Sequence, residues 1–233
     1  MSRILLACMP KSGSTFASDV IASLPKYTKV SLAPALHRRE QEICSYTIYR
    51  KHFFKRNFVA QHHVRNSKYT QRVIRRHNIK VVVLRRNLFD CVASLRDHIR
   101  IESVVVPMAF ISGEEAQKSD RDLEIFIARL VMPWYISFHM SWVEQAGVLN
   151  VNYENLTTDP TSTIREVLAF LGDCRTDAEI NAAIKRVETE NKSRKNVGIV
   201  GRGKSISHEA REIIRAAVLA YEREPDEFFR DLF

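Results

Sequence analysis

The sequence lacks several features that would place it in a simple class. Its apolar runs all fall well short of the ~20 residues that a transmembrane helix needs, and it opens without the apolar segment of a signal peptide. It has no internal repeats, no low-complexity tracts and no linker between independent domains. We therefore expect a cytoplasmic chain that forms one domain over residues 1–233.

Cysteine is scarce and scattered. Cys8, Cys44, Cys91 and Cys174 lack the close paired spacing of a zinc site or a CxxC redox motif, and two of them fall inside apolar runs. Thiols of this kind are typically small buried side chains. The pattern predicts reduced, mostly buried cysteines and no metal site.

Acidic residues are outnumbered by basic ones. The 36 lysines and arginines exceed the 27 aspartates and glutamates, which gives a formal net charge of +9. Such a balance favours anionic partners: nucleic acid, an anionic membrane surface, or a highly charged cofactor and substrate. Charge alone does not choose among these partners.

Four short apolar runs rich in β-branched residues have the length of buried strands. The first, third and fourth are each followed by a helix signal, which is the alternation of a parallel sheet. The composition, 45% hydrophobic and 27% charged, is typical of a globular protein. We predict an α/β fold with a central parallel sheet flanked by helices. The expected strands are 4–9, 58–62, 80–84 and 148–151.

Helix signals are clearest in the C-terminal half. Asp159 and Gly172 bracket one predicted helix, Thr176 with Glu179 forms a capping box for the next, and Ser207 caps a long one that reaches about residue 222. Two further expectations are an ordered functional loop over 191–204 and one or two helices, interrupted by Pro107, Gly113 and Pro133, within 102–140.

The first predicted strand runs directly into a polar turn, residues 10–15, with the sequence Pro-Lys-Ser-Gly-Ser-Thr. Such a strand-to-helix turn can aim several backbone N–H groups at one point, the following helix adds its positive dipole end, and Lys11 adds a full charge. The turn therefore predicts a site for a phosphate or sulfate group. The alternative is an ordinary connection in which a serine or threonine caps the helix.

The turn is not a Walker A loop. That loop places its lysine after the last glycine and is usually joined by an aspartate at a strand end that holds magnesium, whereas here the lysine comes first and the third strand ends in Arg85 and Arg86. The site is predicted to bind an anion without a metal. Arg86 and Ser94, with Asp90 at the helix start between them, are candidates for a second phosphate; the alternative is a surface arginine and a core-facing serine.

Four segments resemble motifs of one enzyme family: residues 10–16 resemble its PKSGTTW, residues 86–94 its RNPxDxxxS, residues 153–156 its YEDL and residues 198–201 its closing GxxG. This family is the sulfotransferases that use 3′-phosphoadenosine 5′-phosphosulfate (PAPS). The resemblance covers most of the chain, with its motifs in the family's order, and it implies a P-loop-NTPase-like fold and an enzyme that forms 3′-phosphoadenosine 5′-phosphate (PAP).

This resemblance implies roles for individual residues. Lys11 is expected at the oxygen that bridges the phosphate and the sulfuryl group, and Arg86 with Ser94 at the 3′-phosphate. Phe16 and Tyr153 are each expected either to stack on adenine or to be core aromatics. The residues expected around the 5′-phosphosulfate are Ser12, Gly13, Ser14 and Thr15; those of the closing loop are Gly198 and Gly201, with Arg194, Lys195 or Arg202 on the 3′-phosphate.

A catalytic base is implied after the second predicted strand, where the family has a KTH-like segment. His63 is the best match and His62 the second, and because neighbouring residues of a strand point to opposite faces, only one of them is expected to reach the donor. Either histidine has a structural alternative as a hydrogen-bonded or surface residue. The family's lysine in this segment is Gln61 here, which removes one positive charge.

The expected function is transfer of a sulfuryl group from PAPS to a hydroxyl or amine of an acceptor: a small molecule, a glycan or a lipid-linked glycan. Residues 36–58 and 102–140 are expected to recognise the acceptor. The first segment has a basic aromatic face, which suits an anionic glycan or a lipid-linked acceptor at an anionic membrane surface; the alternative is the solvated basic side of an amphipathic helix. The alternatives are a P-loop-type kinase and a non-catalytic protein that binds nucleic acid or other anions. No nucleic-acid-reading motif is visible, so nucleic acid is not expected as a partner.

Overall fold

The computed structural model describes residues 2–34, 42–52, 57–106, 108–190, 199–221 and 233. By its internal contacts the chain forms two compact units, each described below by itself. Unit 1 comprises residues 1–85 and 145–198, and unit 2 comprises residues 86–144 and 199–233. Three predicted donor-binding residues, Arg194, Lys195 and Gly198, lie outside the described residues.

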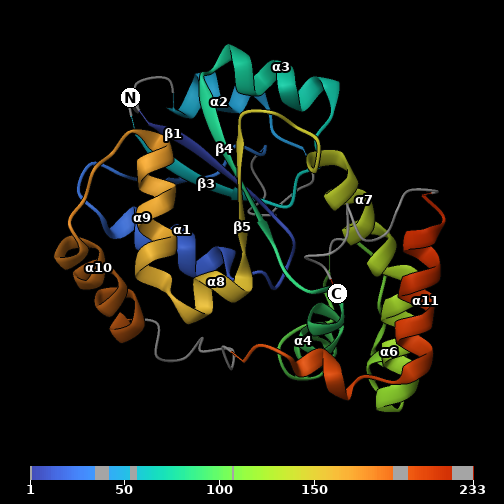
Figure 1. Cartoon of the computed structure of the whole chain (residues 1–233). Helices are drawn as coiled ribbons and strands as arrows, with labels where there is room; N and C mark the ends of the chain where they lie inside the picture. The colour runs from blue at the N-terminus through green and yellow to red at the C-terminus, as the bar shows by residue number, and fades with distance from the viewer. Residues whose placement is uncertain (1, 35–41, 53–56, 107, 191–198, 222–232) are drawn as a thin grey trace. The chain divides into compact units, whose positions relative to one another are not determined.

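Unit 1 is built on a five-stranded sheet in which every paired strand is parallel, in the order β2-β3-β1-β4-β5 (Figure 1). The predicted α/β fold with a central parallel sheet is confirmed, and the four predicted strands are each placed to within a residue or two. The additional strand, β2, has only two residues, too few to form an apolar run. The strands are β1 (Arg3–Cys8), β2 (Lys29–Val30), β3 (Phe58–His62), β4 (Ile79–Arg85) and β5 (Val148–Asn152).

Helices cover both faces of this sheet, as a parallel sheet requires. Side chains of β1 and β4, among them Ile4, Leu6 and Leu84, form one core with helices α1, α9 and α10. Helices α2 and α3 lie on the opposite side (Figure 1). The helices of unit 1 are α1 (Ser14–Ser23), α2 (Ser45–His52), α3 (Lys68–Arg76), α8 (Tyr153–Thr158), α9 (Pro160–Leu171) and α10 (Asp177–Glu190).

The predicted helix caps of unit 1 are confirmed. The Asp159 carboxylate accepts from the Ser162 N–H at 3.0 Å, and Thr176 and Glu179 exchange the two bonds of a capping box at 2.9 and 3.3 Å. Helix α3 was not predicted, because five of its nine residues are polar or basic at its surface and only Val73 and Ile74 supply buried apolar side chains. Its one local signal is the N-cap Ser67, whose hydroxyl accepts from the Thr70 N–H at 3.0 Å.

Unit 2 is helical. Three helices begin within the region 102–140, more than the one or two predicted, because Gly113 and Pro133 lie at helix starts and do not interrupt helices. The buried aromatics Tyr135, Phe138 and Trp142 anchor its core. Its helices are α4 (Leu88–Ile101), α5 (Gly113–Ala116), α6 (Asp120–Leu130), α7 (Met132–Trp142), α11 (His208–Leu219) and the 3-10 helix η1 (Arg202–Ser205).

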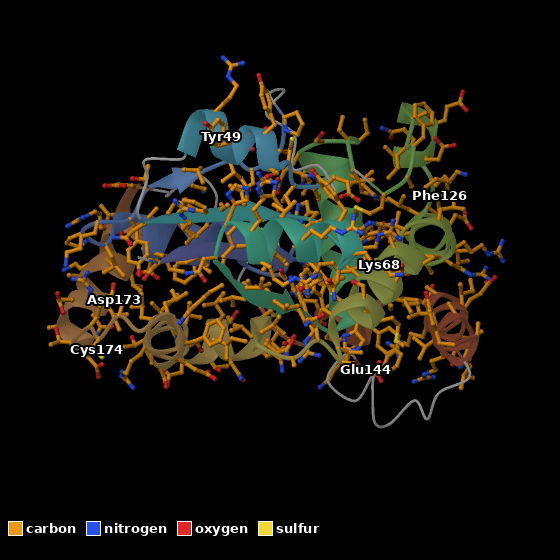
Figure 2. All side chains as sticks on the ribbon, turned by 90° about the horizontal axis from the view of Figure 1, so that it is seen from above. Tyr49, Lys68, Phe126, Glu144, Asp173 and Cys174 are labelled. Carbon is orange, nitrogen blue, oxygen red and sulfur yellow. The ribbon has the colours of Figure 1, made fainter. Side chains whose placement is uncertain are left out.

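All four cysteines are free thiols, as predicted. Cys8 and Cys91 are buried, whereas Cys44 is half-buried and Cys174, between α9 and α10, is exposed (Figure 2). The expectation of mostly buried thiols is therefore wrong for the two cysteines outside apolar runs. Among the described helices, none combines the length and the apolar character needed to cross a bilayer.

Candidate functional site

The turn after β1 has two residues in the left-handed region, Lys11 with φ 65° and Gly13 with φ 73°. The conformation of Lys11 costs a lysine about 1–2 kcal/mol, so its surroundings must impose it. The buried Ser12 hydroxyl donates to the Met9 carbonyl at 2.6 Å, and the Met9 N–H donates to the Leu84 carbonyl of β4 at 3.1 Å. The turn is thereby tied to two strands of the sheet.

Gly13 is the N-cap of α1, and no side chain caps this helix. The alternative interpretation, a serine or threonine N-cap, is therefore wrong. A Cβ atom at Gly13 would lie 3.0 Å from Tyr153 Cδ2 and 3.1 Å from Leu156 Cδ2, so both the space and the backbone angle favour glycine. The first turn of α1 has no acidic residue. Its N–H groups and its dipole therefore point at a place suited to an anion.

Gln61, at the end of β3, is hydrogen-bonded to the start of α1. Its buried amide nitrogen donates to the Ser14 hydroxyl at 2.5 Å and to the Thr15 hydroxyl at 3.4 Å, and its oxygen accepts from Ser18 at 3.5 Å. Since both hydroxyl oxygens accept from Gln61, their own hydrogens are directed to other acceptors. Sequence reasoning noted Gln61 only as a missing charge, because nothing local shows that β3 lies beside α1.

The two adjacent histidines make different contacts. The Leu32 N–H donates to His62 Nε2 at 2.8 Å, so the His62 lone pair already serves the backbone. His63 Nδ1 lies 2.9 Å from the Cys8 carbonyl oxygen. A carbonyl only accepts, so Nδ1 carries the hydrogen, and the neutral ring then has its lone pair at Nε2. The Cys8 thiol also lies 3.4 Å from His63 Nδ1.

In unit 2, Asp90 joins the start of α4 to a glycine-rich segment. Its carboxylate accepts from the Gly201 N–H at 2.8 Å and the Gly203 N–H at 2.6 Å, and it pairs with Arg86 at 3.7 Å. The Arg86 guanidinium also donates to the Ile199 carbonyl at 3.2 Å. The helix cap is Asn87, which accepts from the Asp90 N–H at 3.1 Å. Asp90 therefore lines the helix start and holds the segment.

Gly203 was missed by sequence reasoning, although it is the most closely packed of the glycines that the structure describes. A Cβ atom there would come within 2.4 Å of Phe89 Cβ and 2.8 Å of the Asp90 nitrogen. Ser94 is buried four residues after Asp90, on the same face of α4. Arg202, a candidate for the 3′-phosphate, is paired with Asp97.

The predicted aromatic residues both lie in unit 1. Phe16 is partly buried and packs against the core of that unit. The ring of Tyr153 lies against the Gly13 turn, as the distances from the Gly13 position show. The structure thus places the ring of Tyr153 at the turn.

Comparison of the sequence with models of protein families identifies the family of this chain. The model of the sulfotransferase domain matches residues 1–218. The chain belongs to the sulfotransferase family. A search of curated proteins finds no significant match.

Solved structures of other sulfotransferases share this fold. Mouse sulfotransferase SULT7A1 complexed with PAP is 20% identical to this sulfotransferase, with a TM-score of 0.68 over 97% of this chain and 86% of that one. Retinol dehydratase in complex with androsterone and inactive cofactor PAP is 13% identical, with a TM-score of 0.61 over 95% of this chain and 81% of that one. The family and the fold expected from the sequence motifs are confirmed.

Within the part of this sulfotransferase that the structure describes, no cluster of three or more histidine, cysteine, aspartate or glutamate side chains has the arrangement of a metal site. The turn after β1 offers backbone amides, hydroxyls and the lysine Lys11. These groups donate hydrogen bonds or carry positive charge, so the turn is suited to an oxyanion.

The contacts of the Asp90 carboxylate with Gly201, Gly203 and Arg86, called the Asp90 clamp below, yield a prediction about stability. In Asp90→Asn, the single remaining oxygen cannot accept from both glycine N–H groups, and Arg86 loses a buried counter-charge. We expect a loss of about 1–3 kcal/mol, measured by urea unfolding. Asp122→Asn is the matched control, because Asp122 is exposed and its carboxylate accepts from no described residue other than Ser119, and it should change stability by about 0.5 kcal/mol or less. Equal effects in the two variants would contradict the clamp.

Proposed function

We propose that this sulfotransferase moves a sulfuryl group from PAPS to a hydroxyl or amine of an acceptor and releases PAP. The observation that carries the proposal is the placement of His63 beside the turn that follows β1. His63 donates to the carbonyl of Cys8, and Lys11 follows Cys8 by only three residues, so a basic nitrogen and an oxyanion site are held at the end of one strand.

The residues of the turn fit the 5′-phosphosulfate of PAPS. They provide N–H groups at the start of a ten-residue helix, several hydroxyls, a lysine and no carboxylate. The two solved relatives described above carry PAP, and residues 10–16 of this chain resemble the family's PKSGTTW motif. Lys11 would contact the bridging oxygen, with Ser12, Gly13, Ser14 and Thr15 around the phosphosulfate.

The 3′-phosphate is assigned to Arg86 and Ser94. Both side chains are buried, and Asp90 fixes the Arg86 guanidinium by an ion pair. An arginine held in this way can offer two parallel N–H donors to a phosphate without first losing side-chain freedom. Arg202, which pairs with Asp97, is a second candidate for this phosphate.

PAPS supplies the sulfuryl group and a phosphate leaving group, and the protein supplies the base and the charge stabilisation. His63 Nε2 accepts the proton of the acceptor group, and the Cys8 carbonyl stabilises the imidazolium through Nδ1–H. Lys11 and the turn's N–H groups stabilise the negative charge that develops on the leaving phosphate. The remaining contribution is alignment of the two reactants.

Gln61 stands where the family has a lysine, and it acts on the site through hydrogen bonds to two hydroxyls instead of through a positive charge. Because its amide donates to the Ser14 and Thr15 hydroxyls, those hydroxyls are oriented to donate to the phosphosulfate. The arrangement keeps donors aimed at the anion at a position where the family has a lysine. The positive charge is then concentrated on Lys11.

A titration tests the donor assignment against the kinase alternative. PAP should bind in the absence of magnesium, and ATP with magnesium should bind at least tenfold more weakly, because the turn lacks the Walker arrangement for a metal-bound triphosphate. Isothermal titration calorimetry of the two ligands checks this. Tight magnesium-dependent binding of ATP with no binding of PAP would favour the kinase.

Lys11→Met should lower single-turnover sulfuryl transfer by about 10²-fold or more, because a donor to the leaving phosphate is lost. The matched control is Lys26→Met, which removes a lysine of the same left-handed backbone conformation, with φ 81°, from another turn. The control should transfer at the wild-type rate. Wild-type transfer in Lys11→Met would remove Lys11 from the mechanism.

His63→Asn should lower kcat/KM by about 10²–10⁴-fold, because the asparagine amide can still donate to the Cys8 carbonyl but offers no base. His62→Gln places an amide oxygen where His62 Nε2 accepts from Leu32, and it should stay within about threefold of wild type. The pH profile of kcat/KM should lose its acidic limb only in His63→Asn. The opposite ranking would make His62 the base.

A further inference from the structure

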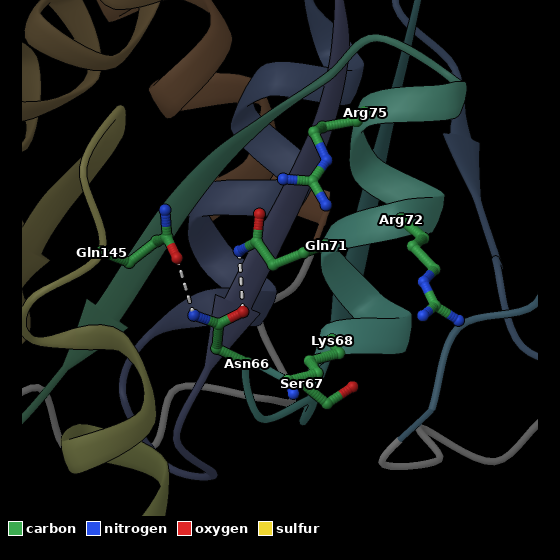
Figure 3. A pocket seen from close by; sticks show the side chains of 7 residues that line it. All are labelled: Asn66, Ser67, Lys68, Gln71, Arg72, Arg75 and Gln145. Atoms are coloured by element: carbon green, nitrogen blue, oxygen red, sulfur yellow. Dashed lines mark hydrogen bonds between the residues drawn. The ribbon is translucent and has the colours of Figure 1, made fainter.

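Unit 1 contains a polar pocket beside α3, outside the residues assigned to the donor. Its volume is about 440 Å³. Figure 3 shows Gln71 and Arg75 pointing from α3 toward the side on which Asn66 and Gln145 lie. None of its lining side chains is apolar or aromatic. They are Asn66, Ser67, Lys68, Gln71, Arg72, Arg75 and Gln145.

The pocket carries three positive charges and no carboxylate. Lys68, Arg72 and Arg75 are spaced four and three residues apart, so they share one face of α3, and all three are exposed. Like charges at this spacing destabilise a helix. None of the ion pairs within the described ranges involves any of the three. A bound anion would offset this repulsion.

One wall of the pocket is a row of hydrogen-bonded amides. Gln71 donates to the Asn66 oxygen at 2.7 Å, and Asn66 donates to the Gln145 oxygen at 3.0 Å (Figure 3). The row joins α3 to the segment before β5, so these amides are held in place. Amides offer both donors and acceptors, as sugar hydroxyls require.

The first residue of the pocket lies close in the sequence to His63, the proposed base. Asn66 follows His63 by three residues, so their Cα atoms are at most about 11 Å apart. Both residues belong to unit 1. An acceptor whose reacting hydroxyl meets His63 can therefore extend a neighbouring group into this pocket.

We propose that the pocket binds the anionic group of an acidic saccharide, a sulfate, phosphate or carboxylate, and thereby selects an acidic glycan as acceptor. The inference rests on the proposed function for the identity of the reaction. Three cations recognise the anion, and the amide row recognises the adjacent hydroxyls. The lining has no apolar side chain that could insert into a bilayer, and the lack of aromatic side chains disfavours stacked nucleic-acid bases.

The test measures binding of a heparin-derived hexasaccharide by calorimetry, with and without PAP. Arg75→Gln should weaken binding roughly three- to tenfold, and Arg72→Gln with Arg75→Gln by more than either change alone. Arg76→Gln is the matched control, because Arg76 is exposed on the same helix turn but does not line the pocket. It should leave the Kd within about twofold. Uncharged maltohexaose should bind at least tenfold more weakly than the hexasaccharide.

A second measurement needs no variant. Phenylglyoxal modifies accessible arginines, and the hexasaccharide should protect Arg72 and Arg75 of the wild-type protein, but not Arg76, as read by mass spectrometry. Equal weakening of hexasaccharide binding by Arg75→Gln and Arg76→Gln, or equal protection of all three arginines, would overturn the proposed role of the pocket. So would tighter binding of single-stranded DNA, or of phosphatidylserine vesicles, with the same sensitivity to Arg75→Gln. PAP titration reports separately on the proposed function: PAP binding without selective hexasaccharide binding overturns only this inference.

Discussion

The register of the parallel sheet around β1 is the constraint on which the proposed chemistry depends. β1 lies between β3 and β4, with Ala7 paired to His62 and Cys8 paired to Leu84. All three strands therefore end at the same edge of the sheet, where ligands of open α/β folds bind. The turn after β1 and the histidine after β3 are neighbours for this reason. A shift of one residue would turn the Cys8 carbonyl away from His63.

Hydrogen bonds to backbone and side-chain groups then give three side chains at this edge a defined state. The Cys8 carbonyl fixes the tautomer of His63, and the Leu32 N–H occupies the lone pair of His62. Gln61 orients two hydroxyls of α1. Each is a contact between elements far apart in the sequence. The site therefore exists only when the sheet and α1 are both in place, which couples the proposed activity to the packing of unit 1.

Unit 2 uses a different device to hold its candidate residues. A buried aspartate accepts from two glycine N–H groups more than a hundred residues away, while it pairs with Arg86. The glycine segment packs so closely on Phe89 that Gly203 has no room for a side chain. Both units thus rely on glycine where the backbone approaches another element, and on buried hydrogen bonds to keep the basic side chains in defined positions.

The features that could be predicted from the sequence are those that a few neighbouring residues determine. Short β-branched runs predicted the strands, Asp159, Thr176 and Glu179 predicted helix starts, and the motifs led to the family, because each of these signals lies within a few neighbouring residues. The tertiary structure decided the rest. It gave His62 and His63 different hydrogen-bond partners, it gave Gln61 its contacts with Ser14 and Thr15, and it put Lys68, Arg72 and Arg75 around a pocket. These outcomes depend on which strands pair and which helix faces meet, and such contacts join residues that no local pattern connects.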